Sequence, residues 1–171
     1  MDAVRDAAAE ALERFPRIDG LVLSVVALVQ GGPTILASGH EIMFATNVMG
    51  PFLFTRLLLD RLAESDGMVV HVVAPFSEDI DWDDLESIRN HKTGPTGVFW
   101  SAMTRLFAKA PSTAGEPLAD LMLDHPDRAA LNGAYFKRAT RITKPDNAMT
   151  DVASTERLWN ELVRTTGSGT P

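Results

Sequence analysis

One histidine stands inside an otherwise apolar stretch, where it could act as a base. His71 lies in the middle of the run 68–74, and strand alternation places it on one face with Val69 and Val73. A buried imidazole can have a lowered pKa and accept a proton near neutral pH. A core histidine held by one hydrogen bond fits the same pattern, and no second residue at fixed spacing completes a dyad.

One asparagine is equally isolated. Asn47 lies in the apolar stretch 41–62, which reads as one long helix, and Gly50-Pro51 follow it closely. The proline predicts a kink in this helix. Asn47 therefore either belongs to a site or satisfies the backbone near the kink.

An acidic run follows the apolar run 68–74. Residues 78–84 contain five carboxylates around Trp82, and Asp79 is the candidate acid or base among them. A cation site is the alternative, but the calcium-loop glycine and the closing glutamate are absent. The third interpretation is a solvated acidic loop without a site.

Aromatic side chains flank the acidic run on both sides. Phe76, Trp82, Phe99 and Trp100 could form the wall of an apolar pocket that binds a substrate. The last two also lie at helical spacing with Met103 and Phe107, within residues 97–110, which fits packing in a core or a dimer interface. No metal site is predicted, since the sequence has no cysteine and its four histidines lack ligand spacing.

The elements that must position these residues alternate between helix and strand. Periodicity and Gly/Pro breaks predict helices over 2–15, 41–62, 98–109, 116–123 and 151–164, a loop over 111–115, and strands over 21–29, 68–74 and 132–137. The C-terminal helix is expected to bury Val152, Leu158, Trp159 and Leu162. This order predicts an α/β fold of three layers, in which a parallel sheet of about three strands is flanked by helices.

Composition limits the classes of function. The chain has 171 residues, 45% of them hydrophobic, which predicts one domain over residues 1–166 and a disordered tail over 167–171. A net charge of −7 argues against a nucleic-acid partner. The apolar run 21–29 is too short to cross a membrane, and the N-terminus does not read as an export signal. A cytoplasmic location is expected by default.

Several motifs in this order resemble the short-chain dehydrogenase/reductase family, most closely its retinol-dehydrogenase-like branch. Residues 17–22 resemble the lead into the family's fourth strand, and residues 46–55 (TNVMGPFLFT) resemble its helix with the NxxG motif. Residues 68–74 resemble the fifth strand, and residues 133–136 and 157–159 resemble the C-terminal strand and helix. The resemblance implies a Rossmann-like fold that is reduced in size, because the chain starts near the fourth strand.

The catalytic positions of that family differ here. The resemblance places the family's serine at Ala74 and its Tyr-x-x-x-Lys at Val98 and Ala102, while the asparagine at Asn47 is retained. No glycine-rich phosphate loop is present in the sequence. Hydride transfer requires a proton donor near the carbonyl, which valine and alanine cannot supply. We therefore expect neither a bound nicotinamide cofactor nor NAD(P)-dependent dehydrogenase activity.

Two functions remain open. The first is a repurposed non-redox enzyme of cyclase, isomerase or dehydratase type that acts on an apolar, polyketide-like molecule in secondary metabolism. The alternative is a non-catalytic binding or regulatory protein derived from the same family. The resemblance implies a homodimer formed through the apolar helices 41–64 and 97–110.

Overall fold

The computed structural model describes seven stretches of the chain, which are residues 1–29, 31–73, 80–90, 112–123, 131–137, 141–143 and 151–169. The chain divides into two compact units. Unit 1 joins Met1–Lys92 to Asp151–Pro171, and unit 2 is Thr93–Thr150. Each unit is described below by itself.

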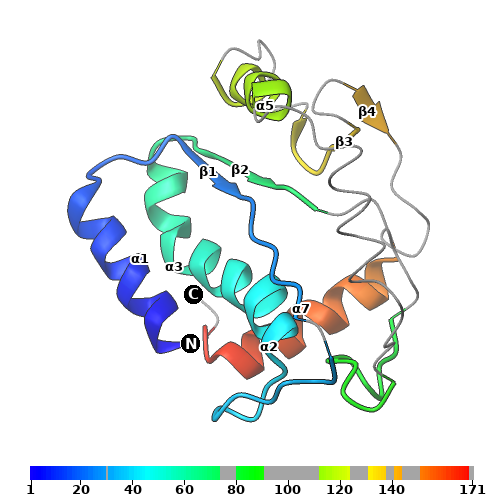
Figure 1. Cartoon of the computed structure of the whole chain (residues 1–171). Coiled ribbons are helices and arrows are strands. Elements are labelled where there is room, and N and C mark those ends of the chain that lie inside the picture. Colours follow the sequence, from blue (N-terminus) through cyan, green and yellow to red (C-terminus); the bar gives the residue numbers. More distant parts are fainter. Residues whose placement is uncertain are drawn as a thin grey trace. The chain divides into compact units, whose positions relative to one another are not determined.

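Unit 1 is a mixed α/β arrangement around a small parallel sheet (Figure 1). Its elements in chain order are α1 (Asp2–Arg14), β1 (Gly20–Leu23), α2 (Ile42–Phe44), a π-helical turn (Ala45–Met49), α3 (Gly50–Glu64), β2 (Met68–His71) and α7 (Val152–Thr166). The predicted helices over 2–15, 41–62 and 151–164 are confirmed within a few residues. The architecture is that of a reduced Rossmann-like fold, as the sequence pattern predicts.

The two strands of unit 1 pair in parallel, with Leu21 opposite Val69 and Leu23 opposite His71. The helical segment 42–64 connects them, which makes a β-α-β unit. Gly67 stands where the chain turns into β2, and a Cβ atom there would lie 2.8 Å from the Ile18 carbonyl oxygen. Only glycine permits this close approach of two backbone segments.

The predicted kink before Pro51 is a π-helical turn. The Gly50 N–H donates to the Ala45 carbonyl, five residues back, where an α-helix would use the carbonyl four residues back. Proline has no N–H to continue the ladder, so the wider turn lies directly before it. Asn47 lies inside this turn.

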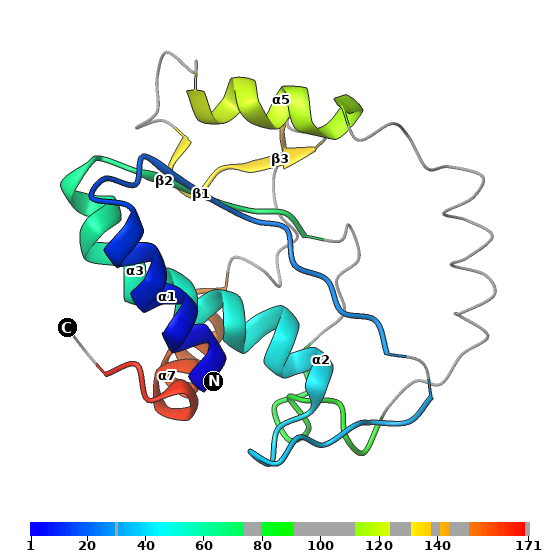
Figure 2. The same ribbon diagram turned by 60° about the vertical axis from the view of Figure 1, so that its left-hand side comes forward.

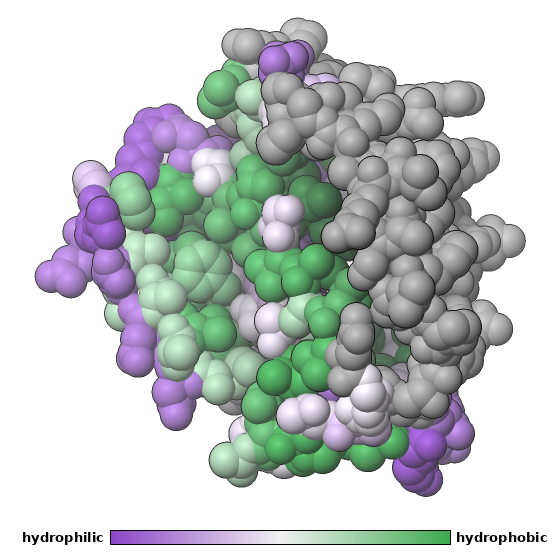
Figure 3. All heavy atoms as spheres, in the orientation of Figure 1, coloured by the Kyte–Doolittle hydropathy of each residue, from purple (hydrophilic) through white to green (hydrophobic). Residues whose placement is uncertain are grey.

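The prediction of a strand over 21–29 that is buried on both faces is wrong. Only Gly20–Leu23 pairs with β2, and residues 24–29 continue without a strand ladder. Val22, Val25, Val26 and Leu28 are exposed. In the orientation of Figure 1, Figure 3 shows apolar surface over this part of unit 1. Helices cover one face of the sheet. The side chains of β1 therefore alternate between a covered face, with Leu21 and Leu23, and an exposed face, with Val22.

The covered face of the sheet packs against α1 and α3, which lie side by side in Figures 1 and 2. Ala8 of α1 and Leu58 and Leu62 of α3 form the buried centre of this core. Leu21 of β1 and Val69 of β2 pack on it from the sheet. The apolar stripe of each helix therefore faces the same strands.

A second core joins α7 to the π-helical turn. Leu162 of α7 packs with Ala45 and Met49, and all three are buried. The Asp151 carboxylate caps α7 by accepting from the Ser154 N–H at 2.9 Å, and Gly167 ends the helix with φ +61°.

The C-terminal helix buries fewer apolar side chains than its sequence pattern indicates. Leu162 is buried and Leu158 packs against the second core, as predicted. Val152 and Trp159 are exposed, so the prediction is wrong for them. Val152 stands in the first turn, and Trp159 lies against Phe52 with ring centroids 5.0 Å apart at the surface. After the helix, the Gly169 carbonyl accepts from the Arg56 guanidinium at 2.9 Å, and residues 170–171 lie outside the described residues.

The described part of unit 2 contains helix α5 (Ser112–Leu123) and strands β3 (Tyr135–Lys137) and β4 (Arg141–Thr143). The helix starts within the predicted loop 111–115. The strand predicted over 132–137 forms, but it pairs antiparallel with β4 in a separate sheet. A turn at Asn132-Gly133, where Gly133 has φ +71°, precedes β3. The parallel sheet in the described part of the chain thus has two strands, where about three were expected.

The continuous helical segment Ile42–Glu64 is longer than the apolar run 21–29. By length and composition alone its mean hydropathy of 1.5 would allow it to cross a membrane. Within unit 1, however, Leu53, Leu58 and Leu62 of the same segment are buried core residues. The segment therefore gives no clear sign of where the protein is located.

Candidate functional site

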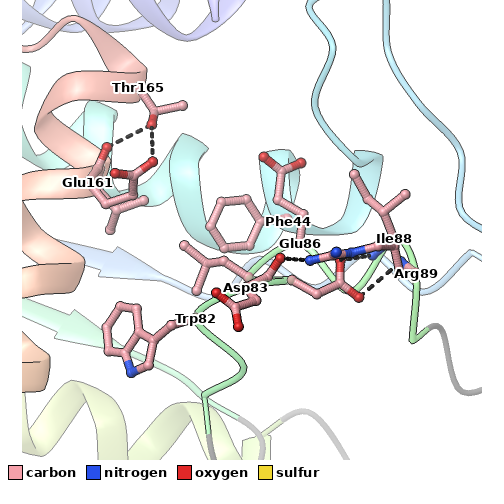
Figure 4. Close-up of a pocket in the computed structure, with 11 residues that line it drawn as sticks. Phe44, Trp82, Asp83, Glu86, Ile88, Arg89, Glu161 and Thr165 are labelled. Atoms are coloured by element: carbon pink, nitrogen blue, oxygen red, sulfur yellow. Dashed lines mark hydrogen bonds and ion pairs between the residues drawn. The ribbon is translucent and has the colours of Figure 1, made fainter.

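An open pocket of about 460 Å³ lies in unit 1 between the loop 80–90, α2 and α7 (Figure 4). We call it the Trp82 pocket. Its apolar lining is contributed by the aromatic rings of Phe44 and Trp82 and by Leu85, Ile88 and Leu162. A concave surface with aromatic walls is typical of small-molecule sites.

The polar lining of the Trp82 pocket is mostly acidic. Four carboxylates, those of Asp83, Asp84, Glu86 and Glu161, line it together with Arg89 and Thr165. The carboxylates come from the loop and from α7, which are far apart in the sequence. The packing of Leu162 against the π-helical turn brings α7 to this position.

Asp84 organises the loop that forms one side of the pocket. Its carboxylate is 7% exposed and accepts from the backbone N–H groups of Ile88 at 2.9 Å, Arg89 at 2.9 Å and Asn90 at 2.7 Å. Burial would raise the pKa of Asp84, but these hydrogen bonds and the Arg89 charge outweigh it and lower the pKa. Asp84 therefore holds the loop as a carboxylate and is not free to exchange protons near neutral pH.

Glu86 ties the loop to the start of the helical segment. Its Oε1 lies 2.8 Å from Nδ1 of His40, and its Oε2 accepts from the Glu41 backbone N–H at 2.6 Å. Glu41 caps the helix, because its Oε2 accepts from the N–H groups of Met43 and Phe44. Glu41 is 2% exposed, and its Oε1 has no hydrogen-bond partner among the described residues.

Trp82 already carries a cation on its ring. The Arg157 guanidinium lies over the indole, 4.2 Å from the ring centroid. Glu161 follows Arg157 by one helical turn, and its pKa is lowered, chiefly by a hydrogen bond from Arg164 and to a smaller extent by Arg157. Arg157 therefore contacts the Trp82 ring and also lies close enough to Glu161 to lower the pKa of its carboxyl.

Asp83 is the carboxylate of the pocket that the rest of the loop leaves available. Its backbone accepts from Arg89 and its N–H donates to Asp81 at 3.0 Å, but its side chain has no partner among the described residues. An exposed carboxylate at a pocket can accept a proton or bind a positive charge.

Asn47 forms a structural contact. Its Oδ1 accepts from the Ala27 N–H at 2.6 Å, and its Nδ2 donates to the Ala27 carbonyl at 2.9 Å. The carboxamide thus pairs with the backbone as a neighbouring strand would, and fixes the segment after β1. Asn47 is not among the residues that line the Trp82 pocket.

His71 is exposed, so the interpretation as a buried core histidine is wrong. The paired strand ends at His71, and the ring therefore lies at the carboxyl end of the sheet, whereas the sequence placed it in mid-strand. Partial burial still lowers its pKa, which keeps the imidazole neutral near pH 7. His71 does not line the Trp82 pocket.

The remaining predicted site residues cannot be placed. Phe76, Asp79, Phe99 and Trp100 lie outside the described residues, as does the predicted helix 97–110. Of the three predicted site residues that the structure describes, Asn47, His71 and Trp82, only Trp82 lines the pocket.

Several pocket residues were missed by the sequence interpretation. Phe44 and Glu161 were not considered, although a helical face that carries Arg157, Glu161 and Thr165 four residues apart is visible in the sequence. Within the described stretches, no group of three or more histidine or acidic side chains has the arrangement of a metal site.

Comparison with known proteins gives one partial match. No family model matches the chain. Over 70 residues the chain is 39% identical to a protein described as short-chain dehydrogenase/reductase bet4 from Neocamarosporium betae. The match covers 39% of this chain and only 20% of that relative. The similarity supports a distant relationship to the short-chain dehydrogenases/reductases over this stretch.

Proposed function

We propose that the chain is a short-chain-dehydrogenase-like protein that binds an apolar small molecule in the Trp82 pocket and transfers no hydride. The observation that carries the proposal is the pocket itself, in which Phe44, Trp82 and Leu162 from three segments form one concave apolar surface. A volume of about 460 Å³ lies within the range of about 300–1,000 Å³ that small-molecule sites have.

The absence of hydride transfer is inferred from the residues at the family's catalytic positions. The resemblance places Ala74, Val98 and Ala102 where the family has serine, tyrosine and lysine. None of these three side chains can donate a proton to a carbonyl oxygen or lower the pKa of a group that does.

A catalytic step of cyclase, isomerase or dehydratase type is the second candidate, and Asp83 favours it. Its unpartnered carboxylate lines an apolar pocket, where a bound molecule with an acidic C–H bond would meet a base. The substrate would then be a polyketide-like molecule, as expected from the sequence. Without such a step, the same pocket would serve a binding or regulatory protein.

The dimer expected from the resemblance is a separate proposal. In unit 1, Leu58 of α3 is a core residue, Leu57 packs against that core, and Phe52 packs against the second core. Much of the apolar surface of helix 41–64 is therefore used within the chain. Light scattering at micromolar concentration tests the dimer, and a stable monomer would contradict it.

Binding is tested by a titration with two neutral apolar aromatics, 4-phenylbutan-2-one and 2-naphthol, followed by NMR. Trp82→Ala removes a pocket wall and should weaken binding about tenfold or more, since a buried aromatic contributes several kcal/mol. Trp159→Ala is the matched control, because Trp159 lies outside the pocket. Equal affinity in the two variants, or saturable binding of NADPH, would contradict the proposal.

A further inference from the structure

The Trp82 pocket has an excess of negative charge around an aromatic wall. Four carboxylates line it against one guanidinium, that of Arg89. Arg89 is already engaged, since it donates to the Asp83 carbonyl and lies 4.0 Å from the Asp84 carboxylate. The lining therefore offers acceptors to a ligand and leaves no uncommitted donor cation of its own.

The Trp82 ring already carries a cation that comes from the chain itself. The Arg157 guanidinium lies on the Trp82 ring at 4.2 Å, close to the carboxylate side of α7. Arg157 is exposed and reaches this position from the helix surface. An exposed cation–π contact contributes only about 0.5–1 kcal/mol, so a ligand that also buries apolar surface can replace it.

An acidic partner is available beside the ring. The Asp83 carboxylate adjoins Trp82 in the sequence and lines the same pocket (Figure 4). None of the side-chain hydrogen bonds or ion pairs of the described residues involves this carboxylate. Glu161 is paired with Arg164, and both carboxylate oxygens of Glu86 are engaged, one with His40 and the other with the Glu41 N–H. Asp83 is thus the carboxylate that can form a new ion pair without breaking an existing one.

From this arrangement we propose that the ligand of the Trp82 pocket is an apolar molecule that carries a protonated amine, which displaces Arg157 from the Trp82 ring and pairs with Asp83. The inference rests on the proposed function, because it names the ligand class of the same pocket. An apolar carboxylate is the opposite case: Arg157 would attract it, but the four lining carboxylates would repel it.

Three ligands of nearly equal shape test the charge. These are 4-phenylbutylamine, 4-phenylbutanol and 4-phenylbutanoate, titrated by calorimetry into the full chain at pH 7. The amine should bind about tenfold more tightly than the alcohol, and the carboxylate should bind more weakly than either. If the alcohol or the carboxylate equals the amine, the ligand class is wrong and the proposed function stands. If none of the three binds, both proposals fail.

Arg157→Ala gives a second readout whose direction depends on the proposal. Removal of the competing guanidinium should raise the ratio of amine to alcohol affinity about fivefold, whereas Asp83→Asn should lower it. Arg14→Ala is the matched control, since Arg14 also lies over an aromatic ring, that of Phe15, outside the pocket. An unchanged or lower ratio in Arg157→Ala would show that the amine does not compete with Arg157 for the ring, and would overturn the proposal.

Discussion

At the scale of single residues, neighbouring carboxylates of the loop 80–90 differ in burial and in hydrogen bonding, and the sequence does not show which is which. Asp81, Asp83 and Asp84 stand within four positions of one another, yet only Asp84 is buried. Its oxygens accept three backbone N–H groups and stabilise the loop, while the Asp83 side chain is exposed at the pocket. The interpretation as a solvated acidic loop fits Asp81 and Asp83, which are exposed, but not Asp84.

Asp84→Asn should destabilise the protein at neutral pH, and the difference from the wild type should shrink as the solution is acidified. The folded pKa of Asp84 is lowered, so its contribution is complete above the pKa of an unfolded aspartate, about 3.9, and is lost as pH falls further. Urea unfolding at pH 7, 5 and 3 measures this difference. Asp60→Asn, at an exposed helical position, is the control. A difference that stays constant between pH 7 and 3 would contradict the assignment.

Asn47 gives a prediction about stability alone. Asn47→Ala removes two hydrogen bonds and leaves the Ala27 N–H and carbonyl unpaired, which should cost about 1–3 kcal/mol. Asn160→Ala, on the exposed side of α7, should be close to neutral. Chemical denaturation compares the two variants. If the affinity of Asn47→Ala for pocket ligands falls while its stability does not, the residue belongs to the site after all.

At the scale of elements, the helices of unit 1 could be predicted because their apolar spacing directly encodes the face that packs. The strand after Gly20 could not be bounded, since an apolar run shows that a segment can pair but not how far its partner extends. Here the partner β2 pairs only over four residues, and the Asn47 carboxamide takes the place of a strand at Ala27. The strand β3 was predicted, but its antiparallel pairing with β4 was not, because sequence periodicity does not determine which strand is the partner.

The candidate site was harder to predict than the fold, for a similar reason. Trp82 could be identified from its place in an acidic run, but Phe44 and Glu161 join it only through the packing of α7 on the π-helical turn. No local pattern links residues that are so far apart along the chain. His71 was misjudged because its exposure depends on where β2 ends.

The contact between α1 and α3 should dominate the stability of unit 1. Leu58 is 2% exposed in that core, whereas its neighbour Leu59 is 40% exposed. Leu58→Ala should cost about 2–5 kcal/mol, and Leu59→Ala, which makes the same change in helix propensity, should cost below about 1 kcal/mol. Thermal and urea unfolding of both variants measure the costs. Similar losses for the two would mean that α3 presents another face to the core.

At the scale of the whole molecule, the two ends of the chain build one unit around an inserted segment. The Arg5 guanidinium of α1 donates to the Thr166 carbonyl at the end of α7 at 2.6 Å, and Leu162 of α7 completes the second core. Residues from both chain segments of unit 1 line the Trp82 pocket, and no described residue of unit 2 is among them.

Replacement of residues 93–150 by a flexible Gly/Ser linker should therefore leave a folded unit 1 that still binds pocket ligands. All described residues of its two cores come from Met1–Lys92 and Asp151–Pro171, so the excision keeps these side chains. We expect a single cooperative unfolding transition and an affinity for 4-phenylbutylamine within about threefold of the full chain, the usual context dependence of such contributions. Circular dichroism and calorimetry on the excised form check both expectations. The same excision combined with Leu162→Ala should lose the second core and the binding together. A form that unfolds without cooperativity while Leu162 is intact would show that unit 1 depends on unit 2 for its fold, and the pocket would then have to be studied only in the full chain.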